Sequence, residues 1–128
     1  MNLQRMIKFN KRTANSFKYA FEGLLTSFKT ERNMRIHVTI MLFVIVTGIV
    51  LKISLWEWIV CTILFGAVIS SELMNTAIEK LVDIVMPNNN VKAKLAKDIA
   101  ASAVLVWAII SAIIGFIIFI PKVLLYLK

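Results

Sequence analysis

The sequence contains few of the residues from which most enzyme sites are built. Its 128 residues include one cysteine, one histidine, four glycines and two prolines. Cys61 has no partner for a disulfide within the chain, so we expect it to be a packing residue. His37 alone does not make a metal site. No GxxxxGK[ST] loop, HExxH, CxxC or glycine-rich dinucleotide motif occurs, which argues against a P-loop kinase and the common zinc and dinucleotide sites.

Acidic residues are also scarce. Seven Asp and Glu stand against fifteen Lys and Arg, and the formal net charge is +8. Twelve of the basic residues fall in two segments, eight of them before residue 36 and four between residues 80 and 97. This asymmetry is typical of the positive-inside rule and predicts a cytoplasmic N-terminus and an external C-terminus. It explains the basicity without nucleic acid, and we expect no nucleic-acid partner.

Apolar residues, in contrast, make up 59% of the chain, more than the roughly 45–50% of soluble domains. Three apolar runs predict membrane spans at about 36–51, 56–75 and 99–120, the last stopped by Pro121. The second helix is expected to continue to residue 86, before Pro87. Residues 1–35 have no long apolar core, so we expect no cleavable signal peptide. The predicted fold is a single all-α integral membrane domain spanning 1–128.

Aromatic and aliphatic side chains recur at helical spacing near the N-terminus, including Phe17, Phe21 and Leu24. Charged residues lie among them, and the pattern predicts an amphipathic helix over about 12–30 that lies in the membrane interface. A helix packed on a partner is the alternative, and the two are compatible.

The most informative stretch carries Glu72, Asn75, Glu79 and Asp83, at steps of three, four and four residues. This spacing places three carboxylates and an amide on one face of a helix. A helix over residues 56–86 extends roughly 46 Å, against a hydrocarbon thickness of about 30 Å. Glu72 is therefore expected just inside the membrane boundary, with Glu79 and Asp83 beyond it. Acids carried to the edge of a membrane indicate a functional site.

Carboxylates, an amide and nearby cations suit one chemistry in particular. Mg²⁺ prefers hard oxygen ligands and usually takes one or two carboxylates together with substrate phosphates. The combination predicts phosphoryl transfer. Lys92, Lys94 and Lys97 lie on the same side of the membrane, where they are either topology signals or ligands of a triphosphate.

Three motifs resemble those of the prokaryotic diacylglycerol kinase family. Residues 72–83 have the highly specific form ExxN[ST]AIExxxD, residues 96–105 have the form AKDxxxSAVL, and ERNMRIH at residues 31–37 is similar to the Gram-positive undecaprenol kinase branch. The resemblance covers about residues 12–105. It implies a homotrimer of three-span subunits with a surface helix, active sites shared between neighbouring subunits, ATP as co-substrate and a Mg²⁺ cofactor in the cytoplasmic membrane.

The resemblance also implies roles for individual residues. Glu72 would be the general base that takes the proton of the lipid hydroxyl, and Glu31 and Glu79 would hold the metal that bridges the ATP phosphates. Asn75 and Asp83 would support that site. The further nucleotide-binding positions, with the asparagine turn nearby, are Arg12, Tyr19, Asn88, Asn89, Asn90, Lys97 and Asp98.

Two positions depart from the diacylglycerol kinase pattern. His37 replaces an acid and Ala101 replaces a serine, and both changes resemble the Gram-positive branch. We therefore expect ATP- and Mg²⁺-dependent phosphorylation of undecaprenol to undecaprenyl phosphate, with diacylglycerol as the alternative substrate. A non-catalytic, cation-conducting oligomer is a more remote alternative, because the first two spans are apolar until Ser70.

Overall fold

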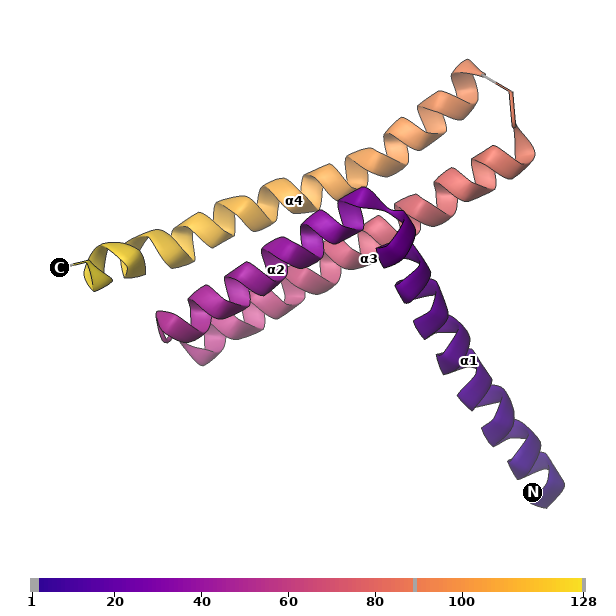
Figure 1. The fold of residues 1–128 in the computed structure, drawn as a ribbon, viewed down its shortest axis with the longest axis horizontal. Helices are drawn as coiled ribbons and strands as arrows, with labels where there is room; N and C mark the ends of the chain where they lie inside the picture. The colour runs from indigo at the N-terminus through magenta and orange to yellow at the C-terminus, as the bar shows by residue number, and fades with distance from the viewer. Residues whose placement is uncertain (1–2, 89, 128) are drawn as a thin grey trace.

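The computed structural model describes residues 3–88 and 90–127, with side chains from residue 12 onward. Four helices follow one another, α1 (Leu3–Thr30), α2 (Arg32–Val50), α3 (Leu55–Val85) and α4 (Val91–Tyr126). Over this part of the chain there is no strand, so the predicted all-α fold is confirmed. Helices α2, α3 and α4 run alongside one another, whereas α1 leaves the bundle at an angle (Figure 1).

Three helices are long and apolar enough to cross a membrane, namely α2, α3 and α4. The 19 residues of α2 extend about 28 Å, close to the hydrocarbon thickness of about 30 Å. The 31 residues of α3 extend about 46 Å. Both α3 and α4 therefore continue beyond the first turn of α2 at one end of the bundle (Figure 1). The acidic end of α3 lies on this extension.

The end of the third predicted span is corrected by the structure. Pro121 lies inside α4, which continues to Tyr126. Proline removes one backbone hydrogen bond, but its fixed φ of about −65° is compatible with a helix. Beyond Lys122 the chain is again apolar or aromatic up to Leu127, and the backbone N–H of Leu127 donates to the carbonyl of Val123 at 3.1 Å. One missing hydrogen bond does not end a helix in which the later backbone hydrogen bonds are still made.

The short connection between α2 and α3 has a defined geometry. Lys52 adopts a positive φ of 51°, and Ser54 then caps α3 through a reciprocal pair of hydrogen bonds with Glu57. Glu57 also pairs with Lys122 of α4 at 3.1 Å. The first turn of α3 is thus tied to the last turns of α4, at the end of the bundle opposite the acidic residues.

The buried core is small and lies where α3 meets α2 and α4. Cys61 is 4% exposed, which confirms its predicted packing position. Many large apolar side chains remain on the surface, for example Phe43 at 72% and Phe116 at 64% exposure. A chain with this surface needs lipid or other helices around it.

Helix α1 begins earlier than the predicted range of 12–30 and ends where expected, at Thr30. Its apolar side chains Phe17 and Phe21 are 73% and 62% exposed, because α1 leaves the bundle (Figure 1). Its location in the membrane interface stays a prediction.

Candidate active site

Glu72 is almost fully buried, with 2% of its surface exposed, and Asn75 on the next turn of α3 is 5% exposed. Both line a cavity of about 200 Å³ between the helices. Among the described residues, Glu72 Oε2 and Asn75 Oδ1 have no hydrogen-bond partner. A buried polar atom without a partner costs about 1–3 kcal/mol. Buried acceptors of this kind, in residues that line a cavity, indicate a site that a ligand completes.

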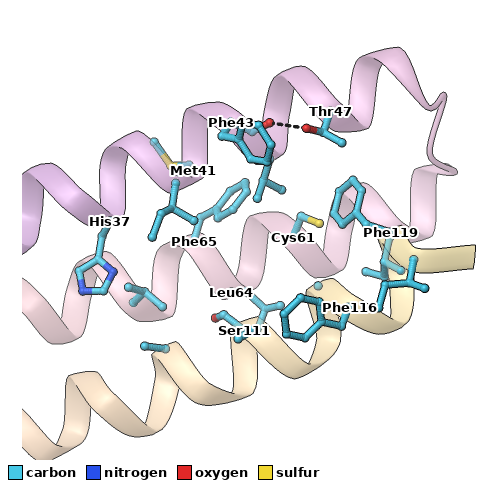
Figure 2. A pocket seen from close by; sticks show the side chains of 18 of the residues that line it. His37, Met41, Phe43, Thr47, Cys61, Leu64, Phe65, Ser111, Phe116 and Phe119 are labelled. Carbon is cyan, nitrogen blue, oxygen red and sulfur yellow. Dashed lines mark hydrogen bonds between the residues drawn. The ribbon is translucent and has the colours of Figure 1, made fainter. Parts of the chain in front are cut away.

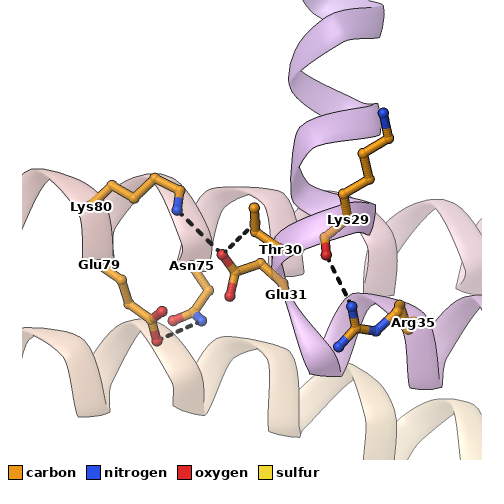
Figure 3. A network of polar contacts seen from close by, with 7 residues as sticks. All are labelled: Lys29, Thr30, Glu31, Arg35, Asn75, Glu79 and Lys80. Carbon is orange, nitrogen blue, oxygen red and sulfur yellow. Dashed lines mark hydrogen bonds and ion pairs between the residues drawn. The ribbon is translucent and has the colours of Figure 1, made fainter.

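The acidic face of α3 is held together by Asn75. Its side-chain amide donates a hydrogen bond to Glu79 Oε1 at 3.1 Å, as Figure 3 shows. The negative charges of Glu79 and Glu31 both act on Glu72. The predicted base and the two predicted metal ligands therefore share one electrostatic environment within a single chain.

Glu31 reaches α3 because the helical conformation is interrupted at this residue, between α1 and α2. It occupies the position before α2 with an extended backbone, and its side chain makes no capping hydrogen bond to that helix. Instead, Glu31 Oε1 accepts from Thr30 Oγ1 at 2.9 Å and from Lys80 Nζ of α3 at 3.3 Å. Arg35 Nη1 donates to the carbonyl of Lys29 at 3.0 Å, which links the two helices across the break (Figure 3).

Two of the predicted nucleotide residues meet across the α3–α4 pair. Lys97 Nζ contacts Asp83 Oδ1 as an ion pair between two solvent-accessible side chains. Asp98, the next residue, is exposed. The exposed end of the bundle therefore presents a lysine and two carboxylates one helical turn or more beyond the buried Glu72.

The asparagine turn connects α3 to α4. Asn90 Oδ1 accepts from the backbone N–H groups of Lys92 at 2.8 Å and Ala93 at 3.4 Å, so this side chain caps α4. Asn88 is exposed, and Asn89 lies outside the described residues. Nucleotide binding by this turn stays a prediction.

Arg12 and Tyr19 are exposed on α1, the helix that leaves the bundle (Figure 1). Within the described side chains, no hydrogen bond or ion pair joins either of them to the acidic residues. A single chain does not bring these two predicted nucleotide contacts to the site.

The residues present fit a magnesium ion in number and chemistry. Within residues 12–88 and 90–127, no group of three or more His, Cys, Asp or Glu side chains is placed to hold a metal. Glu31 and Glu79 offer two carboxylates, however, and Mg²⁺ commonly takes one or two from a protein when phosphates and water complete its shell. The pair is suited to a metal that arrives with a nucleotide.

Two site residues were missed from the sequence. Asn33 of α2 lines the cavity together with Glu72, and its position one turn before His37 is the signal that would have found it. Lys80, which pairs with Glu31, was counted only as a topology signal. Its contact with Glu31 joins residues 49 positions apart, so no local signal in the sequence indicates it.

A larger cavity of about 620 Å³ lies beside the first one, and His37 and Ala108 line both. Its other walls are almost entirely apolar side chains of α2, α3 and α4, among them Phe65, Phe116 and Phe119 (Figure 2). The smaller cavity, which Glu72 and Asn75 line, thus adjoins an apolar groove along the membrane-spanning helices.

Comparison with known proteins gives consistent results. Residues 18–119 match the family described as prokaryotic diacylglycerol kinase. The chain is 43% identical over 107 residues to the undecaprenol kinase of Bacillus subtilis (strain 168), covering 84% of this chain and 87% of that protein. It is 37% identical over 110 residues to the diacylglycerol kinase of Synechocystis sp. (strain ATCC 27184 / PCC 6803 / Kazusa), covering 85% of this chain and 63% of that protein. The protein is a membrane-embedded lipid kinase, and it belongs to the prokaryotic diacylglycerol kinase family.

Proposed function

We propose that this protein transfers the γ-phosphoryl group of ATP to the hydroxyl of undecaprenol and forms undecaprenyl phosphate. One observation carries the proposal: Glu72 is 2% exposed, has an unpartnered oxygen among the described residues, and lines a cavity that adjoins an apolar groove. A lipid alcohol matches both features, because its hydroxyl requires an acceptor and its tail requires an apolar channel.

In the proposed reaction Glu72 Oε2 accepts the proton of the lipid hydroxyl as the hydroxyl oxygen attacks the γ-phosphorus. The bond between that phosphorus and the β,γ-bridging oxygen breaks, and ADP leaves with the electron pair. General-base assistance of this kind contributes about 10²–10⁴-fold to a rate. Asn75 Oδ1 is a second buried acceptor without a partner among the described residues, and its amide is held by the hydrogen bond to Glu79.

The nucleotide side of the site lies further along α3. Glu79 and Glu31 are the residues that would hold Mg²⁺, which when bound neutralises charge on the ATP phosphates. Lys97 would contact the nucleotide after leaving Asp83, with Asp98 beside it. Seven residues separate Glu72 from Glu79, or about 10 Å along the helix, so a lipid hydroxyl and a water-soluble nucleotide approach α3 at neighbouring levels.

Two observations favour undecaprenol over diacylglycerol. The first is the identity of 43% to an undecaprenol kinase against 37% to a diacylglycerol kinase. The second is that His37 and Ala101, the two departures from the diacylglycerol kinase pattern, both line the cavity that contains Glu72. Diacylglycerol remains the alternative substrate. The non-catalytic, cation-conducting alternative loses support, since both relatives are named as kinases.

The assembly we propose is a homotrimer with shared active sites in the cytoplasmic membrane. The large exposed apolar side chains of α2 and α4 support association. Arg12 and Tyr19 also support it, because they would require the site of a neighbouring subunit to act as nucleotide contacts. The distribution of basic residues supports a cytoplasmic N-terminus and a cytoplasmic acidic end of α3, on the side where ATP is.

The proposal is tested with the full-length protein purified in detergent, labelled ATP, Mg²⁺ and either undecaprenol or diacylglycerol. We expect labelled undecaprenyl phosphate, with slower labelling of diacylglycerol and none in a Glu72→Gln control. Faster labelling of diacylglycerol than of undecaprenol would mean that diacylglycerol is the preferred substrate. No labelled lipid from either alcohol would overturn the kinase proposal.

A further inference from the structure

Lys80 occupies a position that the proposed chemistry leaves unexplained. Its Nζ lies 3.3 Å from Glu31 Oε1, and it directly follows Glu79 on α3. The ammonium group therefore forms an ion pair with one of the two carboxylates proposed to bind the metal (Figure 3). The motifs discussed above give it no role.

The charges around this pair indicate what Lys80 does when the site is empty. Glu31 meets α3 at Lys80, the residue after Glu79, and an uncompensated group of carboxylates is unfavourable where water is limited. Lys80 is the lysine that contacts this group among the described residues. It supplies, from within the chain, positive charge of the kind that a metal ion would bring.

The same charges change when a nucleotide binds. ATP carries more negative charge than one Mg²⁺ neutralises, so the loaded site requires additional cations near the phosphates. Lysine is suited to exchange partners, since its ammonium group is a compact charge on a flexible four-carbon stem. The Lys80 side chain is 56% exposed and Glu31 is 26% exposed, so this ammonium is free to turn toward the solvent side where the nucleotide arrives.

We infer that Lys80 is an exchangeable counter-ion and a further nucleotide-binding residue. In the free enzyme it pairs with Glu31, and when Mg²⁺·ATP binds it releases Glu31 to the metal and contacts a phosphate oxygen. This inference rests on the proposed function. A lysine that only tethered the α1–α2 connection to α3 would behave differently, because its loss would misplace Glu31 and weaken metal binding.

The test measures binding of Mn²⁺ alone by electron paramagnetic resonance and binding of Mg²⁺·ATP by calorimetry, both without lipid. In Lys80→Met we expect Mn²⁺ affinity to rise about two- to fivefold, the range for an exposed competing ion pair. We expect Mg²⁺·ATP affinity to fall about 10- to 100-fold, as for a lost hydrogen bond between charged groups. Lys80→Arg should keep both affinities within about threefold of the wild type, since the charge is retained.

Lys29→Met is the matched control. Lys29 lies two residues before Glu31, its side chain is exposed and extends away from Glu31 (Figure 3), and no ion pair of it is found among the described side chains. This control should leave both affinities unchanged. In a Glu31→Gln background, Lys80→Met should no longer raise Mn²⁺ affinity, because the competition for Glu31 is gone.

The inference is overturned if Lys80→Met lowers Mn²⁺ affinity or leaves it unchanged, or if Mg²⁺·ATP binding stays at the wild-type level. An elution volume in size exclusion and a circular dichroism spectrum that match those of the wild type establish that the variant is folded. Lipid phosphorylation by the wild-type protein is measured separately, so a failure of the proposed function is distinguished from a failure of the exchange.

Discussion

The side-chain amide of Asn75 is oriented by Glu79, to which its Nδ2 donates a hydrogen bond at 3.1 Å. This contact leaves Asn75 Oδ1 as a buried acceptor without a partner among the described residues, as is Glu72 Oε2 one turn earlier on α3. One amide therefore links the two halves of the site. Its donor end holds a predicted metal ligand, and Asn75 lines the cavity together with Glu72.

The first prediction concerns the base. Glu72→Gln keeps the size of the side chain but removes its ability to accept a proton, so turnover should fall about 10²–10⁴-fold. Mg²⁺·ATP affinity should change little, because the proposed metal ligands are Glu31 and Glu79. Steady-state lipid phosphorylation and nucleotide calorimetry measure the two effects, and wild-type turnover in this variant would refute the assigned base.

The second prediction concerns Asn75. Asn75→Ala removes a hydrogen bond to a charged acceptor, which contributes about 1.5–3 kcal/mol, and leaves the Glu79 carboxylate less constrained. We expect the Mg²⁺ concentration for half-maximal activity to rise roughly tenfold, in line with that energy. The check is a Mg²⁺ titration at fixed ATP. An unchanged titration midpoint would mean that the hydrogen bond does not position Glu79 for the metal.

The third prediction separates two roles of the pair between Lys97 and Asp83. Lys97→Met and Asp83→Asn both break the same exposed ion pair, which contributes about 1 kcal/mol or less to stability. Only Lys97→Met removes the cation proposed to bind nucleotide, so Mg²⁺·ATP affinity should fall at least tenfold more in Lys97→Met than in Asp83→Asn. Calorimetry on the two purified variants gives the comparison. Equal Mg²⁺·ATP affinities in the two variants would mean that the ion pair has only a structural role.

Much of the fold was predictable, because apolar runs and helical periodicity carry it directly. The all-α class and three long apolar helices follow from the lengths of those runs. The predicted stop at Pro121 was wrong because one proline was given more weight than the residues after it, which continue α4 to Tyr126. The contact of Gly48 with Ile53 and Trp58 could not be predicted, since it depends on the geometry of the short α2–α3 connection.

The site was predictable where its residues share one helix. Glu72, Asn75 and Glu79 lie on α3 at regular spacing, and the structure places them on one electrostatic face. Glu31 was identified only through the family resemblance, because its contact with α3 depends on the interruption of the helix between α1 and α2. Lys80 was missed, since a contact with a residue 49 positions away leaves no trace in local periodicity.

The last prediction concerns the contact between α2 and α3 far from the acidic residues. A Cβ placed on Gly48 would lie 2.9 Å from Trp58 Cη2 and 3.0 Å from Ile53 Cδ1, whereas a Cβ on Gly66 would meet nothing within 4 Å. Overpacking typically costs about 1–3 kcal/mol, and glycine to alanine in an open helix position gains about 0.5–1 kcal/mol. Gly48→Ala should therefore lower the thermal unfolding temperature in detergent, and Gly66→Ala should keep or raise it. Equal shifts in the two variants would contradict close packing at Gly48. Because Gly48 lies near the α2–α3 connection and Glu72 at the other end of the bundle, kinase activity measured well below the unfolding temperature should be retained in both.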